Sequence, residues 1–210
     1  MADIFEDIEG LRNSEIRKVI DSRMEEFKSF REKENGELFN ELCFCLLTAN
    51  FSASGGIKIQ NALGNGFYEL EEGELAARLA ELGHRFPNMR AKFIVEARKH
   101  RESIRRVLDS FEDDAGRRDW FAENVKGLGM KEASHFLRNI GYRNVAIIDF
   151  HIIDLLVRRG IIERPKSKSL TKKKYLEIEN ELKKISEKTG IELGELDLYL
   201  WYRETGKVLK

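Results

Sequence analysis

Apolar residues recur every three or four positions along most of the chain, and this spacing constrains the fold more than any other feature. The pattern runs through residues 16–27, 38–46, 93–111, 176–185 and 193–201. A period near 3.6 places such residues on one face of a helix. The sequence therefore predicts helices over these segments, with one long basic helix over 93–111.

Signals for β-structure are almost absent. Val145–Ile148 is β-branched but too short to build a sheet, and no alternating run is followed by a hairpin turn. Pro87 and Pro165 fall in breaks between helical patterns. Glycines gather where helices are predicted to end and begin, at 55–56, 64–66, 127–129 and 141. The predicted fold class is all-α.

The chain has 210 residues, which is long enough to bury a core as one domain or two small packed ones. No apolar run reaches the ~18–20 residues that span a bilayer, and the first ten residues are acidic rather than a basic leader. We therefore expect a cytoplasmic protein without a membrane partner. Cys43 and Cys45 lie in an apolar run, which predicts buried thiols, and two cysteines cannot form a four-thiolate metal site.

The charges balance in number but not in position. With 37 Lys+Arg against 37 Asp+Glu, the zero net charge argues against a protein coated in positive charge. Residues 1–41, however, carry 12 acidic and 7 basic groups, whereas residues 84–106 carry 8 basic and 2 acidic groups. Residues 164–174 add 6 basic groups and no acid. Each run alone is typical of a solvated helix face, and a polyanionic partner is indicated only if the fold brings the basic runs together.

The glycine-rich segment at 125–129 has features of an anion site. A helix is predicted to end near Asn124 and another to begin near Met130, with Gly127 and Gly129 in a tight turn between them. Such a turn can expose backbone N–H groups at a helix N-terminus, where they favour a phosphate. An ordinary helix–helix connection is the alternative, and the Gly-x-Gly pattern alone does not exclude it.

Lys131 and Asp149 follow this turn with a spacing of 18 residues. One helix and a turn fit between them, so the chain can fold back and place the two side chains across a cleft. A partly desolvated lysine at a helix start is shifted toward the nucleophilic amine, and an aspartate can take its proton. The alternatives are a helix N-cap for Asp149 and a solvated surface position for Lys131.

The segments Gly127-Leu128-Gly129-Met130-Lys131 and Ile148-Asp149-Phe150-His151 together resemble the helix–hairpin–helix DNA glycosylase superfamily. Leu46-Leu47-Thr48-Ala49-Asn50 is similar to an early stretch of that superfamily, with Asn50 in place of the usual Gln. Phe150 departs from the small hydroxyl residue often found after the aspartate. Because the chain lacks a four-cysteine iron–sulfur loop and ends in Lys210, it resembles most the archaeal-type (second type) 8-oxoguanine DNA glycosylase/AP lyases, from about residue 37 to the end.

This resemblance implies a fold and a reaction. It implies two packed helical subdomains with the cleft between them: residues 37–140, ending in the hairpin motif, and residues 1–36 together with 141–210. The expected activity is excision of 8-oxoguanine from double-stranded DNA through a lysine Schiff base, followed by β-elimination that nicks the abasic strand, without metal or cofactor. Lys131 is the expected nucleophile, Asp149 its proton acceptor, and Gly127 and Gly129 the expected phosphate contacts.

The resemblance also implies residues that handle the base. Asn50 is expected to fill the gap left by the flipped nucleotide, Trp201 and Phe86 to stack on the lesion, and Lys210 to contact it. Core packing for Trp201, a loop anchor for Phe86 and a disordered end for Lys210 are the alternatives.

Several further expectations accompany this hypothesis. The basic residues at 84–106 and 164–174 are expected to contact the DNA backbone, with Lys172–Lys174 foremost. His84, His100 and His135 show no ligand spacing and are expected at the surface or at helix caps. The enzyme is expected to be a monomer near the nucleoid of a prokaryote, and the charge-rich, glutamine-poor composition suits a thermophile. An oxidised-pyrimidine glycosylase and a non-catalytic helix–hairpin–helix module remain the alternative functions.

Overall fold

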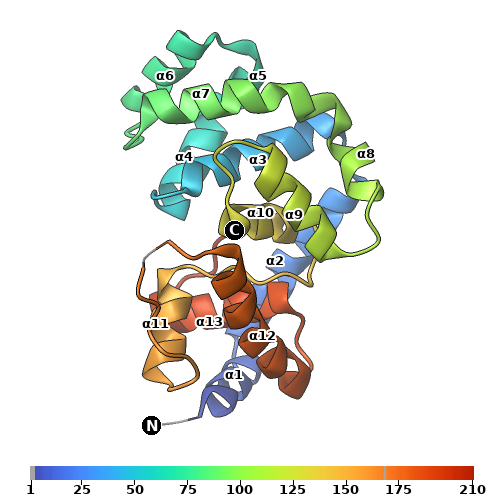
Figure 1. Cartoon of the computed structure of the whole chain (residues 1–210), viewed down its shortest axis with the longest axis vertical. Helices are drawn as coiled ribbons and strands as arrows, with labels where there is room; N and C mark the ends of the chain where they lie inside the picture. Colours follow the sequence, from blue (N-terminus) through green and yellow to red (C-terminus); the bar gives the residue numbers. More distant parts are fainter. Residues whose placement is uncertain (1–2, 168) are drawn as a thin grey trace.

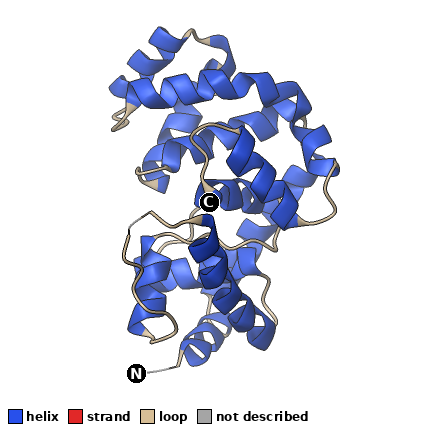
Figure 2. Cartoon of the chain, viewed as in Figure 1, coloured by secondary structure: helices blue, strands red, loops and turns tan. Residues whose placement is uncertain are grey.

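The computed structural model describes residues 3–167 and 169–210, and helices make up most of it (Figures 1 and 2). No strand occurs in these residues. The elements in chain order are α1 (Ile4–Arg12), α2 (Ile16–Ser29), η1 (Phe30–Glu32), α3 (Asn35–Thr48), α4 (Ala53–Leu63), α5 (Gly66–Glu69), α6 (Glu72–Glu81), α7 (Pro87–Ala97), η2 (Arg98–Ser103), α8 (Ile104–Asp109), α9 (Asp114–Asn124), α10 (Met130–Asn139), α11 (Phe150–Arg158), α12 (Lys172–Thr189) and α13 (Leu193–Thr205). The all-α prediction is confirmed.

The buried apolar side chains form two separate cores. One core collects residues between Leu38 and Val145, around α3, which is buried along most of its length. The other combines residues 4–27 of the N-terminus with residues 146–200. In Figure 1 the first set of helices occupies the upper part of the molecule and the second the lower part, with the C-terminus between them. The division at 36/37 and 140/141 stays a prediction; the two cores change over between Val145 and Ala146, a few residues after the second of these boundaries.

Helix α10 is bonded to both sides of this division. Asn139 donates through Nδ2 to Glu41 Oε1 of α3 at 2.7 Å. Its neighbour Arg138 donates through Nη1 to Asp197 Oδ2 of α13 at 2.6 Å, and through Nε to Asn139 Oδ1 at 3.0 Å. All four side chains are buried. Because buried polar groups are costly without partners, this continuous chain of bonds fixes α10 relative to the helices on either side.

The prediction of one long helix over 93–111 is wrong. The segment is divided into α7, the 3-10 turn η2 and α8. Asn35 inserts its side-chain amide at the break: Nδ2 donates to Glu102 O at 2.9 Å, and Oδ1 accepts from Arg105 N–H at 2.8 Å. Both bonds lie at the junction of η2 and α8, so a residue 67 positions away in sequence binds the backbone where the segment changes from one to the other.

The glycine pair at 55–56 also differs from its prediction, because both residues lie inside α4 rather than at a break. A Cβ atom on Gly56 would lie 3.0 Å from Phe44 Cε2 of α3. The missing side chain therefore allows close contact between α3 and α4. The two cysteines are buried as predicted, and burial raises the pKa of each thiol.

Gly141, which follows α10, provides a test of the fold. Its φ is +88°, and a Cβ atom there would lie 2.9 Å from Phe27 O and 3.2 Å from Lys28 Cα. We expect Gly141→Ala to lower the free energy of unfolding by about 2 kcal/mol, because a left-handed conformation and a backbone clash add together. Urea unfolding measures this.

Gly73→Ala is the matched control, because Gly73 lies on exposed α6 with no atom within 4 Å of the added Cβ. It is expected to leave stability unchanged or slightly raised. Equal stabilities of Gly141→Ala and the unsubstituted protein would contradict the close approach of this turn to α2.

Candidate active site

The predicted hairpin is present, and its two glycines differ in what they require. Helix α9 ends at Asn124 and α10 begins at Met130, as predicted. Gly127 has φ +93°, and a Cβ atom on it would lie 2.4 Å from Phe93 Cδ2, so the turn packs directly on α7. Gly129 has φ −97°, and its N–H donates to Glu132 Oε2 at 3.3 Å. Conformation and packing thus require glycine at 127, whereas 129 has an ordinary backbone conformation.

Lys131 lies in the first turn of α10, directly after the hairpin. Its side chain is 29% exposed, and Nζ lies 3.0 Å from Glu132 Oε1. Glu132 therefore has two partners, the ammonium of Lys131 through one oxygen and the backbone of Gly129 through the other. This carboxylate ties the lysine to the hairpin.

Asp149 is the N-cap of α11. Its Oδ1 accepts from Ile152 N–H at 2.9 Å, which confirms that the residue caps the helix. Its Oδ2 accepts from Trp201 Nε1 of α13 at 3.4 Å. The carboxylate remains partly exposed, so the N-cap geometry and a chemical role are compatible rather than alternatives.

The segment before Asp149 is held by buried polar side chains of α12. Tyr175 accepts from Ile148 N–H at 3.2 Å and donates to Ala146 O at 2.7 Å. Glu179 accepts from Ala146 N–H at 2.9 Å. The short β-branched run is therefore neither strand nor helix. Its backbone bonds to side chains instead, which fixes where α11 begins.

Trp201 is in contact with the carboxylate of Asp149 rather than packed wholly into the core. Its side chain is half-buried, and its ring lies edge-on to His151 at 6.2 Å between centroids. His151 in turn lies 4.0 Å from the ring of Phe150, which is 67% exposed. The structure thus brings Asp149, Trp201 and two further aromatic rings together at the start of α11.

Asn50 and Phe86 lie on two turns that are bonded to each other. Asn50 is exposed just after α3, and its φ of +58° is the left-handed conformation that asparagine tolerates. Phe86 N–H donates to His84 Nδ1 at 3.0 Å. Since Nδ1 is the acceptor, Nε2 carries the proton and donates to Leu47 O of α3 at 3.0 Å. The half-buried Phe86 is thereby held close to the end of α3, from which Asn50 projects.

Lys210 is ordered, so the alternative of a disordered end is wrong. Its Nζ donates to Glu41 Oε2 and to Gln60 Oε1, both at 2.6 Å, and lies 4.4 Å from the centroid of the Phe44 ring. These three partners belong to α3 and α4. Sequence reasoning missed Glu41 and Gln60; the apolar run around Glu41 was a signal that this carboxylate is buried.

Two histidines are buried rather than at the surface: His84, whose bond to Leu47 O in the last turn of α3 agrees with the expected helix cap, and His135, which fits neither expectation. His84 bonds to the end of α3 as described above. His135 lies on α10, edge-on to Phe44 at 5.6 Å between centroids. Burial and the positive charges of Arg138 and Lys131 lower its pKa well below the ordinary value of 6.5.

Several residues of the basic segments point into the protein, so the expectation that they contact DNA is wrong for them. Arg90 donates to Ala49 O, Arg98 to Phe67 O and Leu70 O, and Arg105 to Lys33 O. Lys172, by contrast, is exposed and pairs with Asp119 and Glu123 at the surface, so its contact with DNA stays a prediction. Lys168, one of the six basic groups at 164–174, lies outside the described residues.

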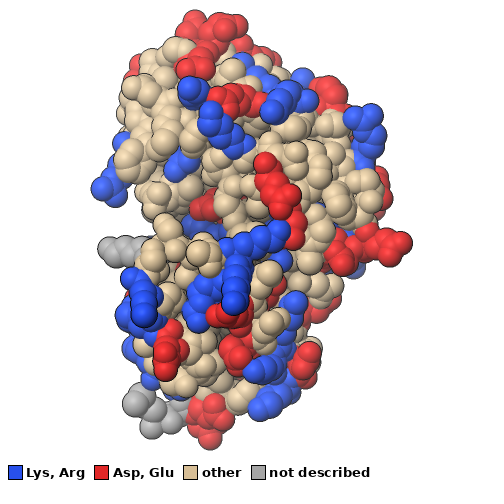
Figure 3. All heavy atoms as spheres, viewed as in Figure 1, with Lys and Arg blue, Asp and Glu red and all other residues tan. Residues whose placement is uncertain are grey.

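The face shown in Figure 3 carries Lys and Arg side chains next to Asp and Glu side chains, with a group of basic residues near its middle. Acidic and basic residues are therefore interspersed on this face instead of forming one basic surface. The charges on this face therefore do not by themselves indicate a DNA partner.

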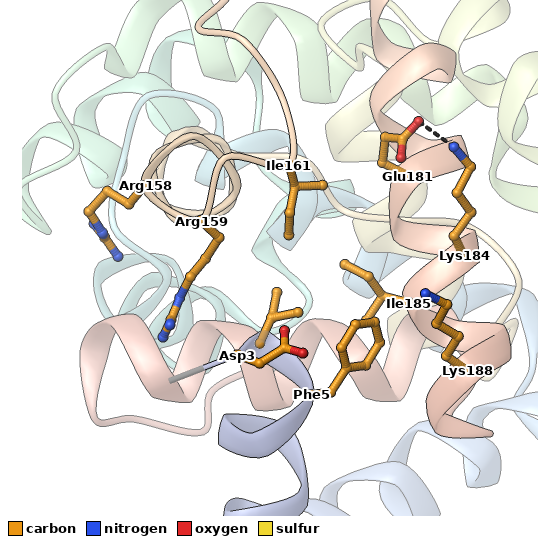
Figure 4. Close-up of a pocket in the computed structure, with 10 residues that line it drawn as sticks. Asp3, Phe5, Arg158, Arg159, Ile161, Glu181, Lys184, Ile185 and Lys188 are labelled. Atoms are coloured by element: carbon orange, nitrogen blue, oxygen red, sulfur yellow. Dashed lines mark hydrogen bonds and ion pairs between the residues drawn. The ribbon is translucent and has the colours of Figure 1, made fainter. Parts of the chain in front are cut away.

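A cavity of about 330 Å³ lies away from these residues, beside α1 and α12. Figure 4 shows its lining, which includes Phe5, Arg158, Lys184 and Lys188 and none of the predicted site residues. Within residues 3–167 and 169–210, no cluster of three or more His, Cys, Asp or Glu side chains could hold a metal ion. No helix in this part of the chain is both long and apolar enough to cross a membrane.

An all-helical chain with a glycine turn, a lysine in the helix after it and an N-cap aspartate on the following helix has the architecture of the helix–hairpin–helix DNA glycosylases. The family model described as 8-oxoguanine DNA glycosylase matches residues 20–191. The chain belongs to this family.

Individual relatives match over nearly the whole chain. The 8-oxoguanine DNA glycosylase/AP lyase of Korarchaeum cryptofilum (strain OPF8) is 59% identical over 208 residues, which cover 99% of this chain and 98% of the relative. The protein of the same name from Methanocaldococcus jannaschii is 52% identical over 207 residues, 99% of each chain. The crystal structure of the Methanocaldococcus jannaschii 8-oxoguanine glycosylase/lyase in complex with a 15mer DNA containing 8-oxoguanine has a TM-score of 0.95 at 52% identity, covering 99% of both chains.

The contrast between the two hairpin glycines leads to a binding prediction. We expect Gly127→Ala to weaken binding to duplex DNA by about tenfold, because the turn must distort to accommodate a side chain against Phe93. Gly129→Ala is expected to have a smaller effect, since the nearest atom to its Cβ is the flexible end of Glu132 at 3.3 Å. Fluorescence anisotropy at one fixed salt concentration measures both. Wild-type affinity of Gly127→Ala would contradict the role assigned to this turn.

Burial of His135 leads to a prediction of pH dependence. The unfolded chain takes up a proton on this side chain near pH 6.5, whereas the folded protein does not, because its pKa is lowered. Stability is therefore expected to fall as the pH drops below about 6.5, by up to about 1.4 kcal/mol per unit from this residue.

Urea unfolding at several pH values, compared between the wild-type protein and His135→Gln, measures this contribution. The variant should show a shallower loss below pH 6.5, whatever its absolute stability. Part of the loss should remain, because burial also lowers the pKa of His84 and of His100. Identical pH slopes would show that His135 is protonated in the folded state.

Proposed function

We propose that this protein excises 8-oxoguanine from double-stranded DNA and then nicks the abasic strand, with Lys131 as nucleophile and Asp149 as its proton acceptor. The observation that carries the proposal is the position of both residues at the first turns of consecutive helices, in a chain of the 8-oxoguanine DNA glycosylase family. The name 8-oxoguanine DNA glycosylase/AP lyase of relatives 52–59% identical over nearly the full length supports both activities.

The reaction uses these side chains in sequence. A base inside a duplex is out of reach, so the enzyme first extrudes the damaged nucleotide. Lys131 leaves Glu132, transfers a proton to Asp149 and attacks C1′ through Nζ. The N-glycosidic bond breaks, and the base departs with its electron pair and takes up a proton. Asp149 supplies that proton as the base departs, and its restored carboxylate offsets the positive charge that develops on the sugar.

Strand cleavage follows from the same covalent bond. Opening of the sugar converts the adduct into a Schiff base between Nζ of Lys131 and C1′. Removal of a proton from C2′ then expels the 3′ phosphate by β-elimination, and water releases the lysine. These steps require no metal or redox cofactor.

The remaining predicted residues have positions that support roles in holding DNA. Gly127 and Gly129 would contact a phosphate through the hairpin backbone, which fixes the register without reading sequence. The exposed Asn50 would fill the gap in the duplex. Phe86 and Trp201 would hold the extruded base in a cleft between the two subdomains, and the chain end at Lys210 would contact it.

The setting of the enzyme is part of the proposal. We place it as a monomer in the cytoplasm of a prokaryote, at the nucleoid, where DNA is its partner. Its relatives come from archaea and thermophilic bacteria, which supports a thermophilic source.

Borohydride trapping on an 8-oxoguanine duplex tests the assignment of Lys131 and Asp149. The wild-type protein is expected to form a covalent adduct, and Lys131→Gln none, because glutamine cannot form a Schiff base. Asp149→Asn is expected to slow excision by about a hundredfold or more, the usual contribution of a general base. An adduct with Lys131→Gln would show that another residue is the nucleophile.

A panel of lesions separates the alternative functions in the same assay. If the protein excises oxidised pyrimidines faster than 8-oxoguanine, its substrate is an oxidised pyrimidine. Salt-sensitive duplex binding without any adduct or nick would identify a non-catalytic DNA-binding module.

A further inference from the structure

The ammonium of the C-terminal lysine is enclosed by partners from the core that contains α3. Two oxygens, Glu41 Oε2 and Gln60 Oε1, accept from Nζ of Lys210 at 2.6 Å each, and the face of the Phe44 ring lies beside it. An ammonium has three N–H donors. With two acceptors and a ring face around it, the side-chain amine of Lys210 is engaged by groups of the protein itself.

Other side chains also hold these two acceptors in place. Glu41 is 1% exposed, and its other oxygen accepts from Asn139 Nδ2 of α10. Gln60 donates through Nε2 to Asn40 Oδ1 at 2.8 Å and to Glu41 Oε2 at 3.1 Å. Because these partners accept, the amide nitrogen must face them, and the carbonyl oxygen of Gln60 must face the lysine.

The chain end beyond this ammonium lies against the helix of the nucleophile. The main chain of Lys210 lies next to the imidazole of His135. His135 lies four residues, about one helical turn, after Lys131 on α10. The last residue thus contacts the protein at two points, its side chain on α3 and α4 and its main chain on α10.

We propose that Glu41 and Gln60 form a slot for the ammonium of Lys210, and that Glu41 is a positioning residue for the base-binding end of the chain. The ring of Phe44 completes this slot beside the ammonium. The slot fixes the main-chain end of Lys210 beside the turn of α10 that carries Lys131. The inference rests on the proposed function.

The physical reason is that a buried carboxylate requires a cation. Glu41 lies among apolar side chains of α3, and an unpaired charge there is costly. Lys210 supplies that charge, so the carboxylate holds the tail in one place. The slot is needed for excision, because it positions the chain end that contacts the base. It is not needed for cleavage of abasic DNA, because that DNA has no base at the site.

The test measures two rates for each variant under single-turnover conditions: excision of 8-oxoguanine and cleavage of a preformed abasic site. We expect Glu41→Gln, which keeps the shape but removes the charge, to lower the ratio of excision to cleavage at least tenfold. Lys210→Met should lower the ratio to the same extent. The double variant should have the same ratio as either single variant, because each single substitution already removes the same interaction between Glu41 and Lys210.

Matched controls lie on the same elements. Glu37→Gln removes an exposed carboxylate of α3 that pairs with Lys33 at 2.8 Å. Lys207→Met removes an exposed lysine from the same tail. Both controls should keep the wild-type ratio. If Glu41→Gln does not fold, Gln60→Ala and Lys210→Met provide the same comparison.

Three results would contradict the proposed role of the slot. These are an unchanged ratio of excision to cleavage in Glu41→Gln, an equal loss of both rates, or a loss in the double variant that is the product of the two single losses. A wild-type protein that neither excises 8-oxoguanine nor cleaves abasic DNA would instead overturn the proposed function. The two failures are therefore distinguishable.

Discussion

The structure depends on one buried chain of polar contacts that passes through α10. It starts at Glu41 in α3, continues through Asn139 and Arg138 of α10, and ends at Asp197 in α13. Burial raises the pKa of Asp197, and the cation of Arg138 opposes that shift. Since removal of either partner would leave a charge without compensation in the interior, the two halves of the molecule have one preferred arrangement.

This constraint explains why the candidate site is assembled from distant segments. Helix α10 carries Lys131 at its start and the residues Arg138 and Asn139 at its end. Helix α13 carries both Asp197 and Trp201, and the latter bonds to Asp149. The contacts that fix α10 against α13 thus also fix the relation between the lysine and the aspartate of the proposed reaction.

Two carboxylates act on lysines in different ways. Glu132 is mostly buried and shares its oxygens between the partly exposed Lys131 and the backbone of Gly129. This pair is open to solvent on one side, so the lysine can exchange partners. Glu41 is buried and holds Lys210 together with Gln60. The same pairing therefore leaves a reactive group available in one place and anchors a chain end in the other.

The sequence by itself determined the helical class, the positions of the hairpin and of α10, and the motif that contains Lys131 and Asp149. These features are local: apolar period, glycine pairs and capping residues act over a few positions along the chain. The sequence did not predict the break at η2, the inward orientation of Arg90, Arg98 and Arg105, or the slot for Lys210. Each of these depends on partners far away in the chain, such as Asn35 for η2 and Glu41 for Lys210. Only the tertiary structure decided them, because whether a charged side chain contacts solvent, a carbonyl or a carboxylate is settled by which helices pack together.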